Sequence, residues 1–326
     1  MADDIVLEVE GLSVDYLTGA KRVHAVQDVD LEVQKGTFLG IVGESGSGKS
    51  TLLFAIARLL GPSAEISKGE VRFLGRDMVR LGDGELRHMR WRDYSVVMQS
   101  AMNALNPVMS IAAQMRDACQ AHSTMSAAQV RERSVEVLRM VGIDPAHLRS
   151  YPHQLSGGMR QRAMIAMALL FTPQLVIMDE PTSSLDVVAQ RSLMIEVRRL
   201  QERLGFAVIF VTHDMSLVGN VADQLAVMYG GQLVEQGVTR ELFSRPLHPY
   251  TRGLLEAFPS IQAERRRLTG IPGSPPDLSR TGHFCRFADR CSIAVETCYQ
   301  VDPPAEDLAG RLVRCIRAHE EVEHAV

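Results

Sequence analysis

The chain has 326 residues, of which 46% are hydrophobic and 23% charged, and its formal net charge is -4. This length predicts one large domain with an appendage, and the composition is that of a folded globular protein. The acidic balance argues against a surface dominated by nucleic-acid binding. No apolar run approaches the roughly 20 residues of a membrane span. The short acidic start predicts no signal peptide, so we expect a cytosolic chain unless a membrane partner holds it.

Hydrophobic periodicity predicts an α/β fold. Residues 5–9 and 25–33 alternate apolar and polar side chains, as half-buried strands do, and residues 37–42 form an apolar run typical of a fully buried strand. A helix is expected over residues 49–60. Later segments alternate between strands (175–178, 208–211) and helices (127–141, 157–171, 187–204). This alternation predicts a mostly parallel sheet with helices on its faces, and the opening strands add a small antiparallel β layer.

A glycine-rich motif follows the buried strand. Residues 43–50, Gly-Glu-Ser-Gly-Ser-Gly-Lys-Ser, fit the phosphate-loop pattern G-x-x-x-x-G-K-[ST] between a strand and a helix. Glycines let backbone N–H groups converge on phosphate oxygens, and the helix start adds unpaired donors. Lys49 is expected to bridge the β- and γ-phosphates and Ser50 to bind Mg²⁺. The alternative, a glycine-rich turn with a surface lysine, is disfavoured by this context. The expected nucleotide ligands here are Gly43, Ser45, Gly46, Ser47, Gly48, Lys49, Ser50 and Thr51.

A second apolar strand, residues 175–178, ends in two carboxylates. In phosphate-loop ATPases an aspartate at such a strand end holds Mg²⁺, which assigns that role to Asp179. The following carboxylate, Glu180, is placed to act as the general base that polarises the attacking water. A strand that ends in Asp-Glu is usually only the start of a solvated loop, but its position after a phosphate loop favours the catalytic interpretation.

Residues 155–161, Leu-Ser-Gly-Gly-Met-Arg-Gln, resemble the signature sequence of ABC ATPases, and their spacing to the Asp-Glu strand matches that family. Ser156 can cap a helix while Gly157 and Gly158 leave backbone donors open to an anion. Ser-Gly-Gly alone is a common loop; the accompanying motifs carry the resemblance. It implies an ABC nucleotide-binding domain over residues 1–245, with a helical subdomain at about residues 100–172.

The resemblance implies roles for four further residues. Gln99 corresponds to the glutamine of the family's Q-loop, a contact of Mg²⁺ and water, and His213 to the switch histidine that contacts the γ-phosphate. Asp186, in Ser-Ser-Leu-Asp at residues 183–186, corresponds to the D-loop aspartate at the dimer interface, with a serine where alanine is usual. Tyr16 is expected to stack on adenine, although an aromatic residue at a strand end is more often part of the core.

A narrower resemblance covers almost the whole chain. Residues 99–108, 248–255, 258–259 and 270–278 are similar to the ATPases of oligopeptide and dipeptide importers. The similarity implies as partners a second, related ABC ATPase, two integral membrane permease subunits and, indirectly, an extracytoplasmic solute-binding protein. It also implies a peripheral location on the cytoplasmic face of the cell membrane. Nickel and glutathione importers share the pattern, so peptide, nickel, glutathione or another solute remain possible cargoes.

Two other functions remain open at this point. One is a soluble ABC ATPase of DNA repair, cluster assembly or translation; repair types need a long coiled-coil insertion and translation types need two ATPase halves in one chain, and this sequence has neither. A degenerate subunit that binds ATP without turnover is disfavoured by the presence of Lys49, Glu180 and His213. Residues 246–326 are expected to form a loop-rich extension, because prolines cluster there and no long periodic segment follows.

Four of the five cysteines lie in this extension: Cys285, Cys291, Cys298 and Cys315. Disulfides are not expected in a reducing compartment, and structural zinc sites usually use cysteine pairs closer in sequence. Four thiolates can hold an iron–sulfur cluster, and the spacing resembles a cluster-binding tail of peptide-importer ATPases. The sequence therefore favours a [4Fe–4S] cluster, with zinc or four unligated buried cysteines as alternatives. His283-Phe284 replace the Pro-x-Gly usual before the first cysteine.

Overall fold

The structure is a computed structural model that describes residues 4–19, 21–99, 104–183, 185–257, 270–279, 282–308 and 310–319. The chain divides into two compact units. Unit 1 comprises Met1–Val6, Val33–Phe38 and Arg80–Val211, and unit 2 comprises Leu7–Glu32, Leu39–Val79 and Thr212–Val326. The domain boundary predicted near residue 245 falls inside unit 2. The division into a nucleotide-binding domain and a C-terminal extension therefore stays a prediction.

Unit 1 combines a parallel sheet with a group of helices. Its strands run parallel in the order β8 (Ala207–Val211), β7 (Leu175–Asp179) and β6 (Tyr94–Val97). All residues of β7 and β8 are buried, which explains why both are apolar throughout except for Asp179 at the end of β7. The helices of this unit are α2 (Asp83–Met89), α4 (Ile111–His122), α5 (Ala127–Met140), α6 (Gly157–Ala168) and α7 (Val187–Leu204), with short 3-10 turns at Pro145–Arg149 and Pro152–Gln154.

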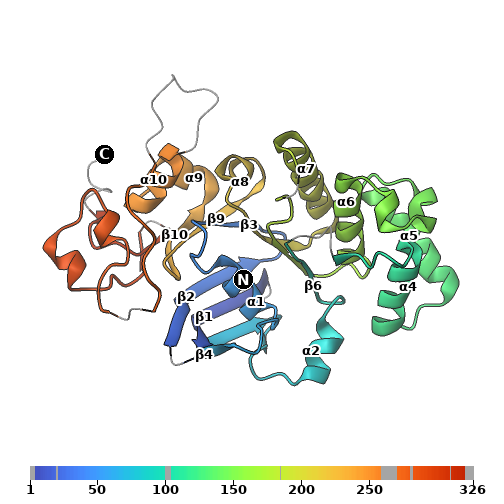
Figure 1. Cartoon of the computed structure of the whole chain (residues 1–326), viewed down its shortest axis with the longest axis horizontal. Coiled ribbons are helices and arrows are strands. Elements are labelled where there is room, and N and C mark those ends of the chain that lie inside the picture. Colours follow the sequence, from blue (N-terminus) through green and yellow to red (C-terminus); the bar gives the residue numbers. More distant parts are fainter. Residues whose placement is uncertain are drawn as a thin grey trace. The chain divides into compact units, whose positions relative to one another are not determined.

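Helices α4, α5 and α6 form the helical subdomain expected from the sequence. Helix α5 packs against both α4 and α6, and the three lie side by side in Figure 1. The Arg133 guanidinium ties α5 to the end of α6, because it donates hydrogen bonds to the carbonyl oxygens of Leu169 (2.7 Å) and Leu170 (2.8 Å). Carbonyls at a helix end lack partners within the helix, so this arginine satisfies them. The contact fixes the orientation of α6.

Unit 2 contains two sheets. In one, the order is β2 (Lys21–Gln34), β1 (Ile5–Thr18), β4 (Ala64–Phe73) and β5 (Arg76–Asp77), and β4 is antiparallel to both β1 and β5. In the other, the order is β11 (Glu306–Asp307), β12 (Leu312–Val313), β10 (Gln232–Val238), β9 (Gln224–Tyr229) and β3 (Phe38–Val42). Strands β3 and β9 are parallel, and the other neighbours are antiparallel. The antiparallel β layer predicted from the sequence is therefore present.

The helices of unit 2 flank these sheets. They are α1 (Lys49–Ile56), α8 (Met215–Val221), α9 (Thr239–Ser244) and α10 (Pro249–Ala257), with 3-10 turns at Ala288–Arg290 and Glu296–Tyr299. Helix α1 is shorter than the expected residues 49–60. The reason is local: Arg58 has a φ of 54°, which no helix accommodates. The long last segment adds β12 to the sheet edge formed by β10.

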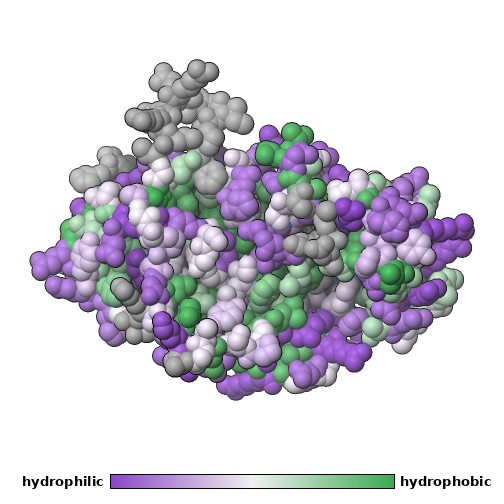
Figure 2. Space-filling view, viewed as in Figure 1, coloured by the Kyte–Doolittle hydropathy of each residue, from purple (hydrophilic) through white to green (hydrophobic). Residues whose placement is uncertain are grey.

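Among the described residues, no helix is both long and apolar enough to cross a membrane. Hydrophilic and hydrophobic residues are intermixed over the face shown in Figure 2.

A buried histidine fixes the start of α10. His248 is 1% exposed, and its Nδ1 accepts the N–H of Tyr250 at 3.0 Å, so the imidazole must be neutral. Burial lowers the pKa of His248 to about 3. The backbone N–H groups of Leu247 and His248 donate to the buried Glu235 carboxylate, each at 2.9 Å.

We expect His248 to make stability depend on pH. Its folded-state pKa lies below the ordinary value of 6.5, so its contribution is complete above pH 6.5 and is lost as the pH falls towards 3. As the pH falls from 6.5 towards 3, the free energy of unfolding decreases by up to about 1.4 kcal/mol per pH unit because of this histidine. Urea unfolding of wild type and His248→Gln at about pH 7.5 and about pH 5 measures this. Equal pH slopes in the two proteins would contradict the assignment.

Candidate nucleotide-binding site

The phosphate-loop motif lies in unit 2 between β3 and α1, as predicted. Its glycines Gly43, Gly46 and Gly48 have φ values of 152°, 79° and 98°, which L-residues rarely adopt. Two of them also touch neighbouring backbone. A Cβ atom on Gly43 would lie 2.1 Å from the carbonyl oxygen of Met228 in β9, and one on Gly48 would lie 2.2 Å from that of Ala25 in β2. The loop is therefore confined by two strands and admits only glycine at these positions.

Lys49 folds back into the loop. It is 7% exposed, and its Nζ donates to the carbonyl oxygens of Glu44 (2.7 Å) and Gly43 (2.9 Å) and lies 3.4 Å from the Ser47 hydroxyl. The ammonium group is thus held at the centre of the loop, and the alternative of a surface lysine is wrong. Helix α1 begins at this lysine with no side-chain cap, so its first N–H groups face the loop. Converging amides and a buried ammonium are the chemistry that binds phosphate.

Two further predicted residues lie in unit 2. The Tyr16 hydroxyl is 3.4 Å from the Thr51 hydroxyl in α1, which brings the expected adenine contact next to the phosphate loop. His213 is exposed and directly follows Thr212, whose N–H donates to the carbonyl oxygen of Ile41 in β3 at 3.2 Å. The His213 side chain is therefore accessible to solvent.

In unit 1, the expected base and the expected Q-loop glutamine are in contact. Gln99 Nε2 donates to Glu180 Oε2 at 2.8 Å, although 81 residues separate the two. Asp179, which ends β7, is 2% exposed. Glu180 has a φ of 44°, and its N–H donates to the carbonyl oxygen of Val211 at 3.1 Å, so the chain turns sharply there. A strained residue whose carboxylate is oriented by an amide is typical of a functional position.

The signature and D-loop residues cap helices in unit 1. The Ser156 hydroxyl accepts the N–H of Met159 at 3.2 Å, so Gly157 and Gly158 begin α6, as the sequence predicted. Asp186 caps α7 by accepting the N–H of Ala189 at 2.9 Å. Both capping side chains are exposed. Ser184 of the D-loop lies outside the described residues, as do residues 258–259 of the importer-like pattern.

The four C-terminal cysteines line one small enclosed cavity, together with the apolar side chains of Phe287 and Ile293. The N–H of Cys285 donates to the carbonyl oxygen of Cys298 at 2.8 Å, which folds the segment around the cavity. Burial raises the pKa of the Cys285 thiol to about 12 and also raises the pKa of Cys291 and Cys315. Among the residues that the structure describes, no group of three or more His, Cys, Asp or Glu side chains is placed so that it could hold a metal ion.

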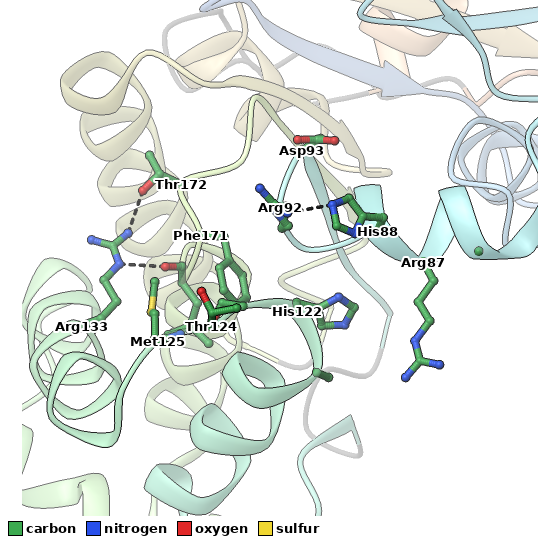
Figure 3. A pocket seen from close by; sticks show the side chains of 14 residues that line it. Arg87, His88, Arg92, Asp93, His122, Thr124, Met125, Arg133, Phe171 and Thr172 are labelled. Carbon is green, nitrogen blue, oxygen red and sulfur yellow. Dashed lines mark hydrogen bonds between the residues drawn. The ribbon is translucent and has the colours of Figure 1, made fainter.

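A different cavity, of about 750 Å³, lies in unit 1 at the C-terminal end of α4 (Figure 3). Its lining is cationic and includes Arg87, Arg92, His88, His122 and Arg133. Arg92 and His88 are hydrogen bonded to each other at 2.9 Å. Arg133 donates to the carbonyl oxygen of Leu169, directly after α6, at 2.7 Å. None of the residues predicted to bind nucleotide lines this cavity.

Sequence reasoning overlooked how the second residue of the phosphate loop is held. The N–H of Glu44 donates to the Tyr250 hydroxyl at 2.9 Å, and the Glu44 carboxylate accepts two hydrogen bonds from the Arg290 guanidinium, both at 2.8 Å. Arg290 lies 246 residues away from Glu44. No local sequence pattern predicts this contact. Arg290 was notable in the sequence only because it directly precedes Cys291.

Two regions of the chain match known families. Residues 26–183 match the family described as ABC transporter, and residues 234–298 match the oligopeptide/dipeptide transporter, C-terminal region. The dipeptide transport ATP-binding protein DppD of Caldanaerobacter subterraneus subsp. tengcongensis is 40% identical over 319 residues, 97% of this chain and 98% of that protein. The oligopeptide transport ATP-binding protein OppD of Escherichia coli is 41% identical over 321 residues, 98% of this chain and 95% of that protein.

Solved structures agree with this relationship. The dimeric structure of MJ0796, a bacterial ABC transporter cassette, superposes with a TM-score of 0.64 at 28% identity and covers 72% of this chain and 99% of that chain. A post-hydrolysis state of the same cassette, bound to ADP and Pi, gives the same TM-score of 0.64. The chain therefore belongs to the ABC transporter family of ATPases. Within it, the chain carries the C-terminal region of the oligopeptide/dipeptide transporters. The predicted fold class, a phosphate-loop ABC ATPase, is confirmed.

We expect Gly43→Ala to impair nucleotide binding without unfolding the chain. The added Cβ would meet Met228 O at 2.1 Å, so the loop backbone must move away from β9. Backbone strain of this kind costs about 1–3 kcal/mol, which lowers MgATP affinity by about fivefold to 150-fold. Calorimetric titration measures it, with circular dichroism as the check on folding. Gly61→Ala is the matched control, because nothing lies within 4 Å of its Cβ. Equal affinity of the two variants would contradict the confinement argument.

Proposed function

We propose that this chain hydrolyses ATP to power the import of oligopeptides or dipeptides through a membrane permease. The observation that carries the proposal is the buried Lys49 ammonium within a glycine loop that two strands confine. The peptide cargo rests on the near full-length similarity to DppD and OppD and on the matched C-terminal region.

In this proposal the nucleotide phosphates bind the N–H groups of residues 43–51 and the Lys49 ammonium. Mg²⁺ would be held by Ser50, Asp179 and Gln99, and Tyr16 would stack on adenine. Glu180 takes the proton from the attacking water, while Gln99 orients its carboxylate through the 2.8 Å hydrogen bond. His213 would contact the γ-phosphate. These roles assign the residues of the phosphate loop, Gln99, the Asp179-Glu180 pair and His213 to one reaction, ATP hydrolysis.

The proposed partners are a second, related ABC ATPase and two integral membrane subunits, which hold the chain at the cytoplasmic face of the membrane. The chain has one copy of each motif, so its signature residues Ser156, Gly157 and Gly158 serve the nucleotide of the partner ATPase. Val187 and Val188, which follow Asp186, support a protein interface there, because they are 72% and 79% exposed. Two adjacent apolar side chains at such exposure gain by burial against a partner.

The Glu180→Gln variant tests the catalytic assignment. The amide retains size and hydrogen bonding but cannot accept a proton, so phosphate release should fall by about 10²–10⁴-fold in the assembled transporter. MgATP affinity should stay within about twofold, because the base does not bind the ground state. Glu202→Gln is the matched control, since Glu202 is an exposed carboxylate paired with Arg198 at 2.9 Å. Near-normal phosphate release from Glu180→Gln would refute the assignment.

The proposal also includes a [4Fe–4S] cluster held by Cys285, Cys291, Cys298 and Cys315. All four thiols line one enclosed cavity, which supports a shared ligand. Four thiolates can hold an iron–sulfur cluster. Structural zinc sites usually use cysteine pairs two to four residues apart, and these four cysteines include no such pair. When bound, the cluster would stabilise the segment that encloses it.

Anaerobically purified protein should be brown and contain about four iron and four sulfide per chain. A Cys291→Ser variant should lose most of the iron, because one ligand of the set is removed. Cys119→Ser is the matched control: this thiol is 1% exposed within α4 and should leave iron content unchanged. Elemental analysis and visible absorption measure the outcome. Stoichiometric zinc without iron would overturn the proposed cluster.

A further inference from the structure

Glu44 is held through both its backbone and its side chain by residues from the end of unit 2. Tyr250, in α10, accepts the Glu44 N–H at 2.9 Å. Arg290, which ends the 3-10 turn Ala288–Arg290, donates one hydrogen bond to each Glu44 carboxylate oxygen at 2.8 Å. A bidentate pair of this kind is strong and fixes orientation as well as distance.

The Arg290 guanidinium makes further hydrogen bonds with all of its nitrogens. Its Nε donates to Pro272 O at 2.6 Å, and its other nitrogens reach the Tyr229 hydroxyl (3.2 Å) and Ile271 O (3.4 Å). The guanidinium carbon lies 5.6 Å from the centre of the Tyr229 ring. The Arg290 side chain is only 5% exposed, and that of Glu44 is 25% exposed. This is a partly desolvated pair with defined geometry, unlike the solvent-screened ion pairs on the surface.

An aromatic cluster keeps Tyr250 in place. Its ring centre lies 4.5 Å from that of Tyr229 and 5.4 Å from that of Phe287, and Phe287 also contacts His248 at 5.8 Å. Tyr250 is 0% exposed, and burial raises its pKa, so the phenol stays neutral. The hydroxyl is therefore a fixed acceptor for one amide of the phosphate loop.

These contacts bear on ATP in two ways. First, they fix the backbone that follows Gly43, and a loop already ordered in its binding shape loses less entropy when the ligand arrives. Second, Glu44 places a negative charge in a loop that must receive the negative phosphates, and like charges at short range repel. Arg290 neutralises that carboxylate.

We propose that Arg290 and Tyr250 are positioning residues for ATP. Through them, the C-terminal segment holds the phosphate loop in the shape that binds the nucleotide. This inference rests on the proposed ATP function of the loop. Residues beyond position 245 then serve two purposes: they enclose the cysteine cavity and they determine nucleotide affinity. Cys291 directly follows Arg290, so the two purposes meet at adjacent residues.

The test uses the full-length chain in its assembled transporter, with MgATP as the probe. Arg290→Gln should weaken MgATP binding by about tenfold, because it unpairs a charge-assisted contact. KM for ATP should rise by a similar factor, with kcat within about twofold. Tyr250→Phe, which keeps the ring and removes only the hydroxyl, should weaken binding by about threefold to tenfold.

A charge-specific readout separates positioning from mere stabilisation. In the Arg290→Gln background, adding Glu44→Gln should recover part of the lost affinity, since the unpaired carboxylate is removed. Arg311→Gln is the matched control: Arg311 is 7% exposed and donates to Arg245 O at 2.7 Å, away from the phosphate loop. It should lower Tm and leave MgATP affinity unchanged.

Unchanged affinity in Arg290→Gln would overturn the proposal, as would equal losses of affinity in Arg290→Gln and Arg311→Gln. If Arg290→Gln does not fold, Tyr250→Phe decides: affinity equal to wild type then refutes the inference. The ATP function itself is judged separately. If wild type fails to bind MgATP, or if Lys49→Ala binds as tightly as wild type, the proposed function is wrong.

Discussion

The close approach of the phosphate loop to the backbone of two strands is the constraint on which the site depends. Gly43 lies against Met228 O and Gly48 against Ala25 O, each too close for a Cβ atom. Because the loop backbone lies directly against β2 and β9, its shape is defined, and the Lys49 ammonium is held inside it by the carbonyl oxygens of Gly43 and Glu44. A loop with this little freedom can bind phosphate without first becoming ordered.

The C-terminal segment supports that constraint. Tyr250 and Arg290 hold the one loop residue, Glu44, that would otherwise oppose an anionic ligand. The same segment brings four thiols to one cavity and adds β12 to the sheet edge beside β10. The extension has little regular secondary structure, yet it is part of a compact unit. Hydrogen bonds from buried arginines and an aromatic cluster stabilise it in place of long helices and strands.

In unit 1, the carboxylate that we propose as the general base makes a similar long-range contact. Glu180 adopts a φ of 44°, and Gln99 donates to its side chain. Helix caps at Ser156 and Asp186 fix where α6 and α7 begin, which sets the position of the signature and D-loop residues.

The sequence by itself determined the α/β class, the phosphate loop, the Asp179-Glu180 pair at the end of β7 and the signature, because each is a contiguous pattern whose spacing reflects its own chemistry. It overestimated the length of α1, since Arg58 has a positive φ that ends the helix. Only the tertiary structure decided that Gln99 meets Glu180, 81 residues apart, and that Arg290 meets Glu44, 246 residues apart. Such contacts join side chains that no periodicity relates, so they become visible only once the strands and turns are in place.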